Sequence, residues 1–353
     1  YNAENLVDEI RLGEKDKVSY GYDTNLNLIS FTDQTGAVIE YAYDADHNMT
    51  SWKNQNEALV ITNTYDANHR VTKQVDGEGH VMTLEYLEGR TKTTDAKGNV
   101  ETTWFDAKGQ TTKVEYADNR QVLKTFVNGL LTEETLENGI RWSYTYDQNG
   151  NQLTAARSDG FKETRTYDAN NNLLTKSNTA GQSEAWTYDA RSNKPSHTDA
   201  LGQTTTYAYN ELNQMISETD PLKHATTYEY NEQGRVSKVT YPDGTFYTYT
   251  YNAAGYLLTA TDQDHRKTTH VLNARNEIVQ IINPDGGIKS FTYDAAGNKL
   301  SESDFNGNVT AYEYDLYGNV VKMTDPLGNV TTYTYDSNQN LIKTTYPDGA
   351  ETT

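Results

Sequence analysis

The sequence repeats itself at a fixed spacing, and this spacing constrains the fold more than any other feature. An aromatic residue, usually followed by Asp or Asn, recurs along the chain and defines seventeen anchor positions, of which Tyr86, Phe126 and Leu272 are degenerate. Of the sixteen intervals between anchors, thirteen are 21 residues long. One interval of 22 follows Tyr43, and intervals of 19 and 20 lie between Tyr86 and Tyr146. A fixed period of this length predicts a repeat architecture, in which each unit packs only against its neighbours.

The clearest anchors are aromatic–Asp pairs, which we expect to hold each repeat together. The Asp of each pair is predicted to accept hydrogen bonds from the turn that follows it. A row of general acids repeated along a sheet would serve no mechanism. The structural anchors are Tyr22 and Asp23, Tyr43 and Asp44, Tyr146 and Asp147, Tyr167 and Asp168, Tyr188 and Asp189, Tyr293 and Asp294, Tyr314 and Asp315, and Tyr335 and Asp336.

Two further columns predict two turns in each repeat. Gly or Asn recurs four residues after the anchor, and Gly recurs fourteen residues after it, where Lys223 and His265 are the exceptions. Gly and Asn tolerate positive φ, and Pro precedes the second glycine in several repeats, as in a tight turn. The turn glycines are Gly150, Gly297 and Gly318 in the first column, and Gly202, Gly286 and Gly328 in the second.

The segments between these turns alternate like β-strands. A second aromatic stands two residues before the anchor, as Tyr144 does before Tyr146, and Thr145 lies between them. Residues two apart in a strand share a face, so one face is aromatic and the other carries hydroxyls. We therefore predict an all-β array of about 32 antiparallel strands joined by hairpins. Because adjacent strands twist, such a sheet must wind as a spiral. The alternative is a parallel β-solenoid with one coil per repeat.

The repeat covers the chain from residue 1 to 353 without a predicted separate domain. The register is regular over 146–353, and the repeats over about 86–146 are diverged. For this diverged stretch a bulge or altered curvature is the simplest interpretation. The chain opens and stops within the pattern, so we expect it to be a piece of a longer polypeptide.

Composition excludes several classes of partner. The formal net charge of −20 argues against a nucleic-acid partner and against docking on anionic lipid. No apolar run is long enough to cross a membrane. The absence of cysteine excludes disulfides, Cys-based zinc sites and a Cys nucleophile.

No residue set predicts catalysis, cofactor binding or a metal site. Asp44 to Asn48 resembles the start of a calcium loop, but Met49 stands where the loop requires glycine and Gln55 where it requires Glu. His265 and His270 are five residues apart, which would place them on opposite faces of a shared strand. No nucleophile elbow or phosphate-binding loop is present, so we predict that the chain is not an enzyme.

The repeat resembles the YD repeats of Rhs-family proteins. The resemblance rests on Tyr293-Asp294-Ala295-Ala296-Gly297-Asn298-Lys299-Leu300, on its copy at 314–321, and on Asp325-Pro326-Leu327-Gly328-Asn329. It implies a spiral sheet that forms the hollow shell of an Rhs-type or related polymorphic toxin. The shell would encapsulate a C-terminal toxin domain not present in this chain. The autocleavage element of the family is not matched, because Asn329 follows Gly328 within an ordinary repeat turn.

The resemblance also implies partners and a location. The expected partners are the C-terminal toxin segment as cargo and a secretion or delivery machinery, and the expected location is secreted or at the bacterial cell surface. The alternative function is a cell-surface adhesion or carbohydrate-binding array, in which exposed tyrosines would stack on glycans.

Overall fold

The computed structural model describes residues 1–12 and 16–353 and contains strands only. The first strands are β1 (Glu9–Leu12), β2 (Asp16–Tyr22), β3 (Leu28–Thr32), β4 (Val38–Tyr43), β5 (Met49–Lys53), β6 (Leu59–Tyr65), β7 (Val71–Asp76), β8 (Val81–Leu87), β9 (Arg90–Thr94), β10 (Val100–Phe105), β11 (Thr111–Glu115) and β12 (Gln121–Val127). The middle of the chain forms β13 (Leu130–Thr135), β14 (Arg141–Tyr146), β15 (Gln152–Arg157), β16 (Lys162–Tyr167), β17 (Leu173–Asn178), β18 (Ser183–Thr187), β19 (Ser196–Thr198), β20 (Thr204–Tyr209), β21 (Met215–Thr219), β22 (Ala225–Tyr230), β23 (Val236–Thr240) and β24 (Phe246–Tyr251). The last strands are β25 (Leu257–Asp262), β26 (Lys267–Leu272), β27 (Ile278–Ile282), β28 (Ile288–Tyr293), β29 (Lys299–Ser303), β30 (Val309–Tyr314), β31 (Val320–Thr324), β32 (Val330–Tyr335), β33 (Leu341–Thr345) and β34 (Glu351–Thr352).

Every strand pairs antiparallel with the strands before and after it in the chain. The 34 strands of residues 1–12 and 16–353 form one sheet that does not close on itself, from β1 at one edge to β34 at the other. The predicted antiparallel hairpin array is confirmed, and the parallel solenoid is wrong. The count exceeds the expected 32 because β33 and β34 follow the last anchor, Tyr335.

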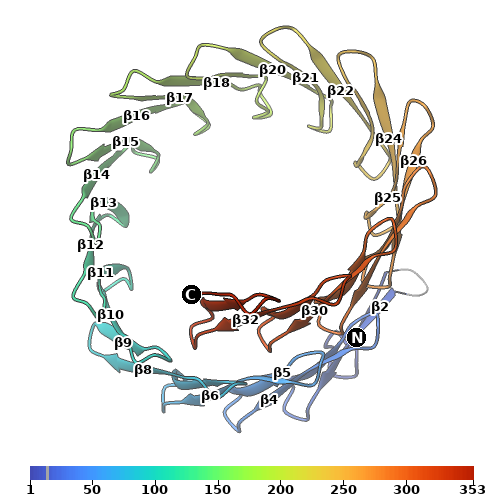
Figure 1. Cartoon of the computed structure of the whole chain (residues 1–353). Helices are drawn as coiled ribbons and strands as arrows, with labels where there is room; N and C mark the ends of the chain where they lie inside the picture. Colours follow the sequence, from blue (N-terminus) through green and yellow to red (C-terminus); the bar gives the residue numbers. More distant parts are fainter. Residues whose placement is uncertain (13–15) are drawn as a thin grey trace.

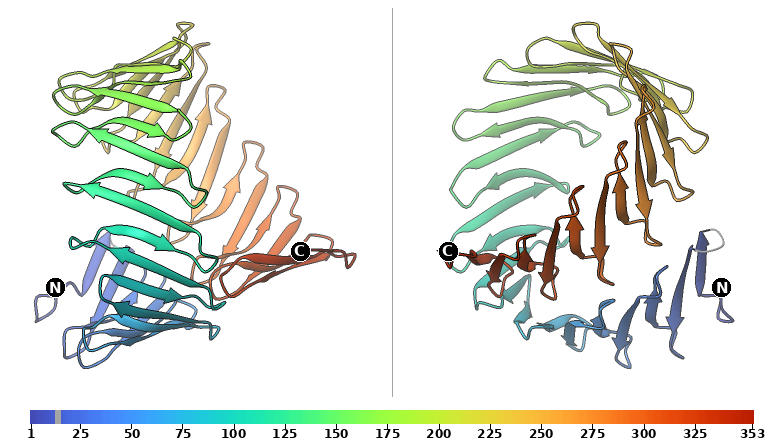
Figure 2. Two further views of the ribbon diagram at one scale, coloured as in Figure 1. Left: turned by 90° about the vertical axis from the view of Figure 1, so that its left-hand side faces the viewer. Right: turned by 45° about the vertical axis from the view of Figure 1, so that its right-hand side comes forward.

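The sheet winds around an axis as a spiral of more than one turn. Figure 1 looks along this axis and shows the strands arranged as a ring, with β30 and β32 lying beside the N-terminal hairpins. Figure 2 shows that the two ends are displaced along the axis, so the last strands form the start of a second winding. Progressive twist between neighbouring strands accounts for this curvature.

Two kinds of turn alternate along the sheet. The anchor turn follows each anchor residue, and the glycine turn surrounds the residue fourteen positions after the anchor. Most hairpins with an anchor turn carry a β-bulge at the anchor: Thr145 pairs with Thr154, but Tyr146 pairs with Gln152, so Leu153 has no partner. A bulge bends its strand and increases the local twist, so its recurrence at the same place in most repeats curves the sheet regularly.

The irregular spacings have local structural causes. In the interval of 22 residues, Trp52 pairs with Ile61 and Lys53 with Leu59, so one extra residue bulges out of β6. The interval of 20 begins with a two-residue turn in which Asn128 and Gly129 both have positive φ, at 53° and 86°. That geometry belongs to a type I′ hairpin, which needs fewer residues than an anchor turn.

The wall is one sheet thick and has no deep core. No large side chain among the described residues is fully buried, and Ala155 is the one buried apolar side chain there, 8 % exposed. On β14 the residues Trp142, Tyr144 and Tyr146 are half-buried, whereas Ser143 and Thr145 are exposed. The aromatic face thus supplies most of the apolar contact, and hydroxyls line the other face.

Candidate functional site: the repeat lattice and the seam between windings

Eleven anchor tyrosines, with Tyr43 and Tyr188 not among them, link neighbouring hairpins through their hydroxyl groups. Tyr146 Oη donates to the carbonyl oxygen of Leu131 at 2.7 Å, fifteen residues earlier in the chain. Because the ring is half-buried, burial raises the pKa of this hydroxyl and keeps it a donor. The same bond, at 2.6 to 3.1 Å, is made by Tyr22, Tyr65, Tyr86, Tyr167, Tyr209, Tyr230, Tyr251, Tyr293, Tyr314 and Tyr335.

The Asp after the anchor is occupied within its own turn. Asp147 Oδ1 accepts from the backbone N–H groups of Asn149 and Asn151, both at 2.9 Å, and Oδ2 accepts from the Asn151 side-chain amide at 2.9 Å. The amide of Asn151 is the first cause that lowers the pKa of Asp147. Equivalent bonds to the backbone and to the side chain four residues on are made by Asp23, Asp44, Asp168, Asp189, Asp294, Asp315 and Asp336.

Both turn columns take positive φ whether or not the residue is glycine. Among the glycines, φ is 83° to 91° at Gly150, Gly297 and Gly318 in the first column; in the second it is 78° to 83° at Gly202, Gly286 and Gly328. Lys223 and His265 adopt the same conformation, with φ of 72° and 60°. The backbone of the repeat therefore sets the conformation of these positions, and the side chain adapts to it.

The acidic and histidine residues that could suggest a metal site lie in ordinary repeat positions. Asp44 accepts the backbone N–H groups of Asp46 and Asn48, both at 2.9 Å, as other anchor-turn carboxylates do. His265 lies in a glycine turn and His270 in β26. The described part of the chain contains no group of three His, Asp or Glu side chains placed to hold a metal ion. It also contains no helix that could span a membrane.

The two windings meet along a line that we call the winding seam. It joins the glycine turns that begin at residues 33, 54, 76 and 95 to the anchor turns that begin at residues 273, 294, 315 and 336. Paired residues are 238 to 243 positions apart in the sequence, which is the length of one winding. The contacts are therefore made turn to turn, and no strand of one winding pairs with a strand of the other among the described residues.

Polar and charged contacts hold the seam at both of its ends. Near one end, Arg275 Nη1 lies 3.7 Å from Asp33 Oδ2, and Asp33 is only 8 % exposed. Near the other end, Asn338 Nδ2 donates to Asp95 Oδ2 at 2.8 Å. Beside it, Lys97 pairs with Asp336 and lowers the pKa of that carboxyl well below its usual range.

The middle of the seam is more closely packed. Leu316 lies directly against the backbone at Gly77, where any side chain would collide with it. The adjacent Tyr317 hydroxyl is buried, and burial together with the neighbouring Asp76 raises its pKa well above the ordinary value. One repeat away, Asn56 Nδ2 donates to Asp294 Oδ2 at 3.1 Å.

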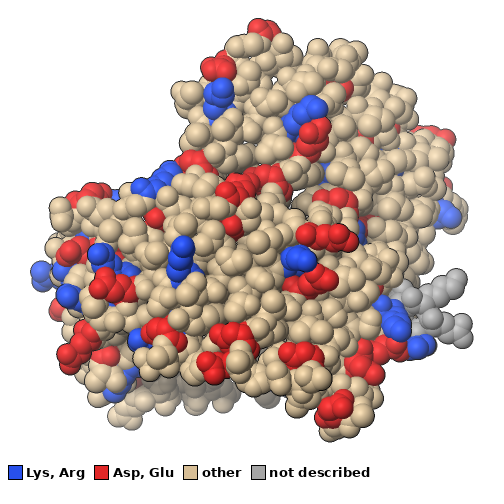
Figure 3. Space-filling view, turned by 90° about the horizontal axis from the view of Figure 1, so that it is seen from below, with Lys and Arg blue, Asp and Glu red and all other residues tan. Residues whose placement is uncertain are grey.

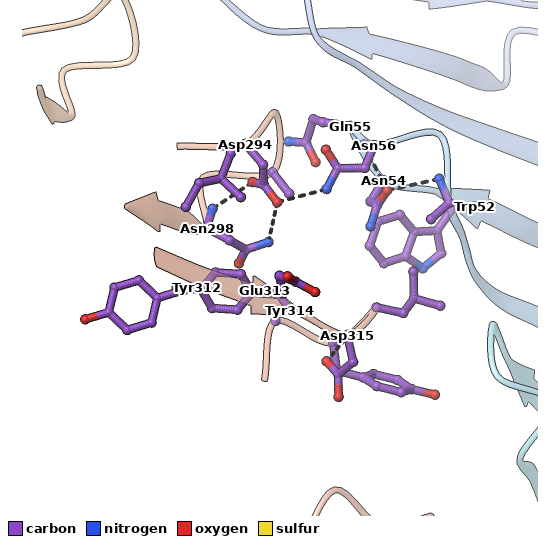
Figure 4. A pocket seen from close by; sticks show the side chains of 16 residues that line it. Trp52, Asn54, Gln55, Asn56, Asp294, Asn298, Tyr312, Glu313, Tyr314 and Asp315 are labelled. Carbon is purple, nitrogen blue, oxygen red and sulfur yellow. Dashed lines mark hydrogen bonds between the residues drawn. The ribbon is translucent and has the colours of Figure 1, made fainter. Parts of the chain in front are cut away.

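A cavity of about 630 Å³ opens at the seam beside this last contact (Figure 4). The first winding contributes Trp52 and the glycine turn that begins at Asn54, and the second contributes residues of β30 and two anchor turns. Figure 4 shows the Trp52 indole on one side of the space and the rings of Tyr312 and Tyr314 on the other. On the face shown in Figure 3, acidic and basic side chains are mixed without a broad basic patch.

The sequence does not predict the seam. Its partners are separated by a whole winding, and that distance is not a multiple of the 21-residue period. One signal was available. Tyr317 occupies the third position after an anchor, where most repeats carry a small or polar residue, whereas Arg275 and Asn338 hold the same position and fit that pattern. A tyrosine at this turn position indicates a contact outside the repeat itself.

Comparison with known families and structures gives a consistent result. The model of the family described as RHS Repeat matches residues 22–51, 127–162, 196–225, 214–245, 230–267, 300–329 and 314–351. A crystal structure of TcdB2-TccC3 without its hypervariable C-terminal region matches with a TM-score of 0.61 at 13 % identity, over 94 % of this chain and 23 % of that chain. The TcdB2-TccC3-Cdc42 structure matches with a TM-score of 0.60 at 14 % identity and the same coverage. At this identity the likeness concerns the fold.

A sequence relative is more similar over a shorter stretch. The Double-stranded DNA deaminase toxin A of Burkholderia cenocepacia (strain H111) is 36 % identical over 114 residues, which are 32 % of this chain. The matched part spans 6 % of that relative.

Proposed function

Because this chain belongs to the RHS repeat family, whose model matches more than half of its residues, we propose that it is a segment of a shell that encloses a C-terminal toxin segment of its parent polypeptide. The fold is that of the RHS shell, and the known proteins that it resembles are toxins or toxin components. The proposal adds that this shell encloses a cargo.

The observation that carries the proposal is the docking of the second winding on the first. A sheet that merely curved would leave its turns free, but here the turns of successive windings interlock along the seam. A wall that continues across its own seam can separate an interior from the solvent. The fine mixture of charges and the net charge of −20 favour a soluble outer surface.

The proposal gives the chain a structural role rather than a catalytic one. Its most regular carboxylates are held in turns by two to three hydrogen bonds each, which suits a lattice and leaves them unavailable as general acids. We further propose that the parent is secreted or presented at the cell surface, where a delivery machinery would be its partner. The toxin relative supports this location.

Electron cryomicroscopy of the parent polypeptide tests the proposal. We expect a hollow particle whose wall contains these repeats and whose interior holds weak density for a poorly ordered segment. Limited proteolysis of the same particles should leave the interior segment intact until the wall is denatured. A solid rod, or a C-terminal segment that is cleaved as fast in the intact particle as in the denatured one, would rule out enclosure.

A further inference from the structure

The cavity at the winding seam combines aromatic rings with negative charge. At about 630 Å³ it falls within the range of small-molecule pockets, roughly 300–1,000 Å³. Its walls carry the carboxylates of Asp294, Glu313 and Asp315, and no Lys or Arg is among the described residues that line it. We propose that this cavity binds a linear aliphatic polyamine, and that the bound polyamine holds the two windings together.

Two of the three carboxylates are held by neutral groups. Glu313 accepts from Lys322 Nζ at 2.7 Å, and that ion pair balances its charge. Asp294 and Asp315 each accept from the side-chain amide four residues on, at 2.9 Å. Within residues 1–12 and 16–353, neither of these two carboxylates forms an ion pair with a Lys or Arg. The cavity therefore keeps two unbalanced negative charges, on successive anchor turns 21 residues apart in the sequence.

Arg275 lies close to Asp294 but does not balance its charge. Arg275 Nη2 donates to the backbone oxygen of Asp294 at 2.6 Å, while the guanidinium pairs with Glu277 at 3.1 Å and with Asp33 at 3.7 Å. Burial alone would raise the pKa of Asp294, but hydrogen bonds from two asparagine side chains lower it below the ordinary value. Asp294 therefore stays ionised at neutral pH.

Acceptor atoms in the cavity remain free for the N–H groups of a ligand. A carboxylate can accept about four hydrogen bonds. Asp315 receives three, from the backbone of Tyr317 and from the backbone and side chain of Asn319, all at 2.9 Å. The side chain of Gln55 lines the cavity and makes no hydrogen bond with any other residue in the described ranges. A protonated amine carries two or three N–H donors for such oxygens, whereas a quaternary ammonium has none.

The aromatic rings suit both the charge and the methylene groups of a polyamine. Tyr312 Oη donates to Glu302 at 2.9 Å, and Tyr314 Oη donates to the carbonyl oxygen of Lys299 at 2.8 Å. These bonds hold both rings before any ligand arrives, so little side-chain freedom is lost on binding. Trp52 faces the two rings across the cavity (Figure 4). Ring faces attract ammonium groups, and methylene groups pack on the same faces.

Binding should strengthen the seam because the ligand contacts both windings. Trp52 and Gln55 belong to the first winding, whereas Tyr312, Tyr314 and Asp315 belong to the second. A ligand that binds only the closed seam favours that state by mass action. This inference does not rest on the enclosure of a toxin, because it concerns the repeat array alone.

Titration of the chain with spermidine tests the proposal. Magnesium chloride at equal ionic strength is the comparison, because any cation screens a net charge of −20. We expect spermidine to bind with a Kd on the order of 0.1 mM and to raise the thermal midpoint more than magnesium chloride does.

Removal of the two unbalanced charges should weaken this binding. We expect Asp294→Asn/Asp315→Asn to raise the Kd for spermidine at least about tenfold. The turns should survive, because Asn210 and Asn231 hold the same position in other repeats and accept the same backbone bonds. Asp147→Asn/Asp168→Asn is the matched control. It removes two charges from the same column away from the seam and should leave the Kd unchanged.

Substitution of Trp52 tests the aromatic wall. Trp52→Leu should weaken binding several-fold, whereas Trp52→Phe keeps an aromatic face and should retain most of it. The proposal is overturned if spermidine does not bind at about 10 mM, or if magnesium chloride raises the thermal midpoint equally. It is also overturned if the two double variants bind spermidine equally well, or if Trp52→Leu binds it as tightly as Trp52→Phe.

Discussion

At the scale of single residues, the repeat depends on where its polar atoms go. Tyrosine outnumbers phenylalanine by 28 to 7 because the anchor ring packs on the sheet while its hydroxyl reaches the preceding hairpin. The sequence predicted the anchors and their half-buried face. It could not predict the acceptor of the hydroxyl, because a carbonyl fifteen residues earlier becomes a neighbour only when the hairpin register is known.

Tyr293→Phe isolates this hydrogen bond. The ring stays, but the carbonyl oxygen of Ile278, now 2.9 Å from the hydroxyl, loses its donor. We expect the free energy of unfolding to fall by about 1 kcal/mol, the usual net value of one such bond. Tyr247→Phe is the control, because Tyr247 lies outside the anchor column and is 40 % exposed. If chemical denaturation gives the same loss of unfolding free energy for both substitutions, the anchor hydrogen bond does not stabilise the fold.

Glu302 predicts a response to acid. Burial alone would raise its pKa, but hydrogen bonds from Tyr312, Lys289 and Lys299 lower it from 4.5 to about 2. A carboxyl whose pKa is depressed on folding stabilises the protein above its unfolded pKa and loses that stabilisation as the pH falls through its folded value. We therefore expect Glu302→Gln to flatten the fall in stability between about pH 5 and pH 2. An unchanged pH profile of the thermal midpoint would contradict this assignment.

At the scale of the hairpin, glycine is a preference of the turn and not a requirement. The column pattern predicted both turns of each repeat and, through them, the strand order. It could not predict that Lys223 and His265 would keep the glycine conformation, because sequence alone does not show whether an exception breaks the turn or strains it. The neighbouring hairpins hold these two residues at positive φ, so the backbone strain is confined to the turn.

Lys223→Gly should relieve this strain. A non-glycine residue at a φ of 72° costs about 1 kcal/mol relative to glycine, and the turn hydrogen bond from Lys223 N to Asp220 O at 3.0 Å would remain. We expect the free energy of unfolding to rise by roughly 0.5–1 kcal/mol. Lys223→Ala removes the same side chain but keeps the strain, so it should leave stability nearly unchanged. A gain with alanine as large as the gain with glycine would trace the effect to the lysine side chain instead.

At the scale of the whole molecule, the seam decides how the spiral closes. The sequence predicted winding from strand twist but not the circumference, which depends on small bulges summed over many hairpins. The contacts at the seam then fix the circumference, because they set which turn of the second winding lies against which turn of the first. Its carboxylates Asp76, Asp95 and Asp294 have pKa values below the ordinary range in spite of burial, because hydrogen bonds favour their charged form. The seam is therefore expected to stay closed down to strongly acidic pH.

Removal of the seam cations should open the second winding without unfolding the hairpins. In Lys97→Ala/Arg275→Ala, Asp336 and Asp33 lose their partners across the seam, while every strand pairing remains. Because the chain has no cysteine, spin labels can be placed at Asp46→Cys and Asn306→Cys, on turns at the far ends of the hairpins that meet near Asn56 and Asp294. We expect the distance between the labels to lengthen and its distribution to broaden in the double variant, with unchanged strand content by circular dichroism.

Arg157→Ala is the control, because it breaks an ion pair inside a single turn and should leave the distance between the labels unchanged. A narrow, unshifted distance in the double variant would mean that packing of Leu316 and Tyr317 alone is enough to close the spiral.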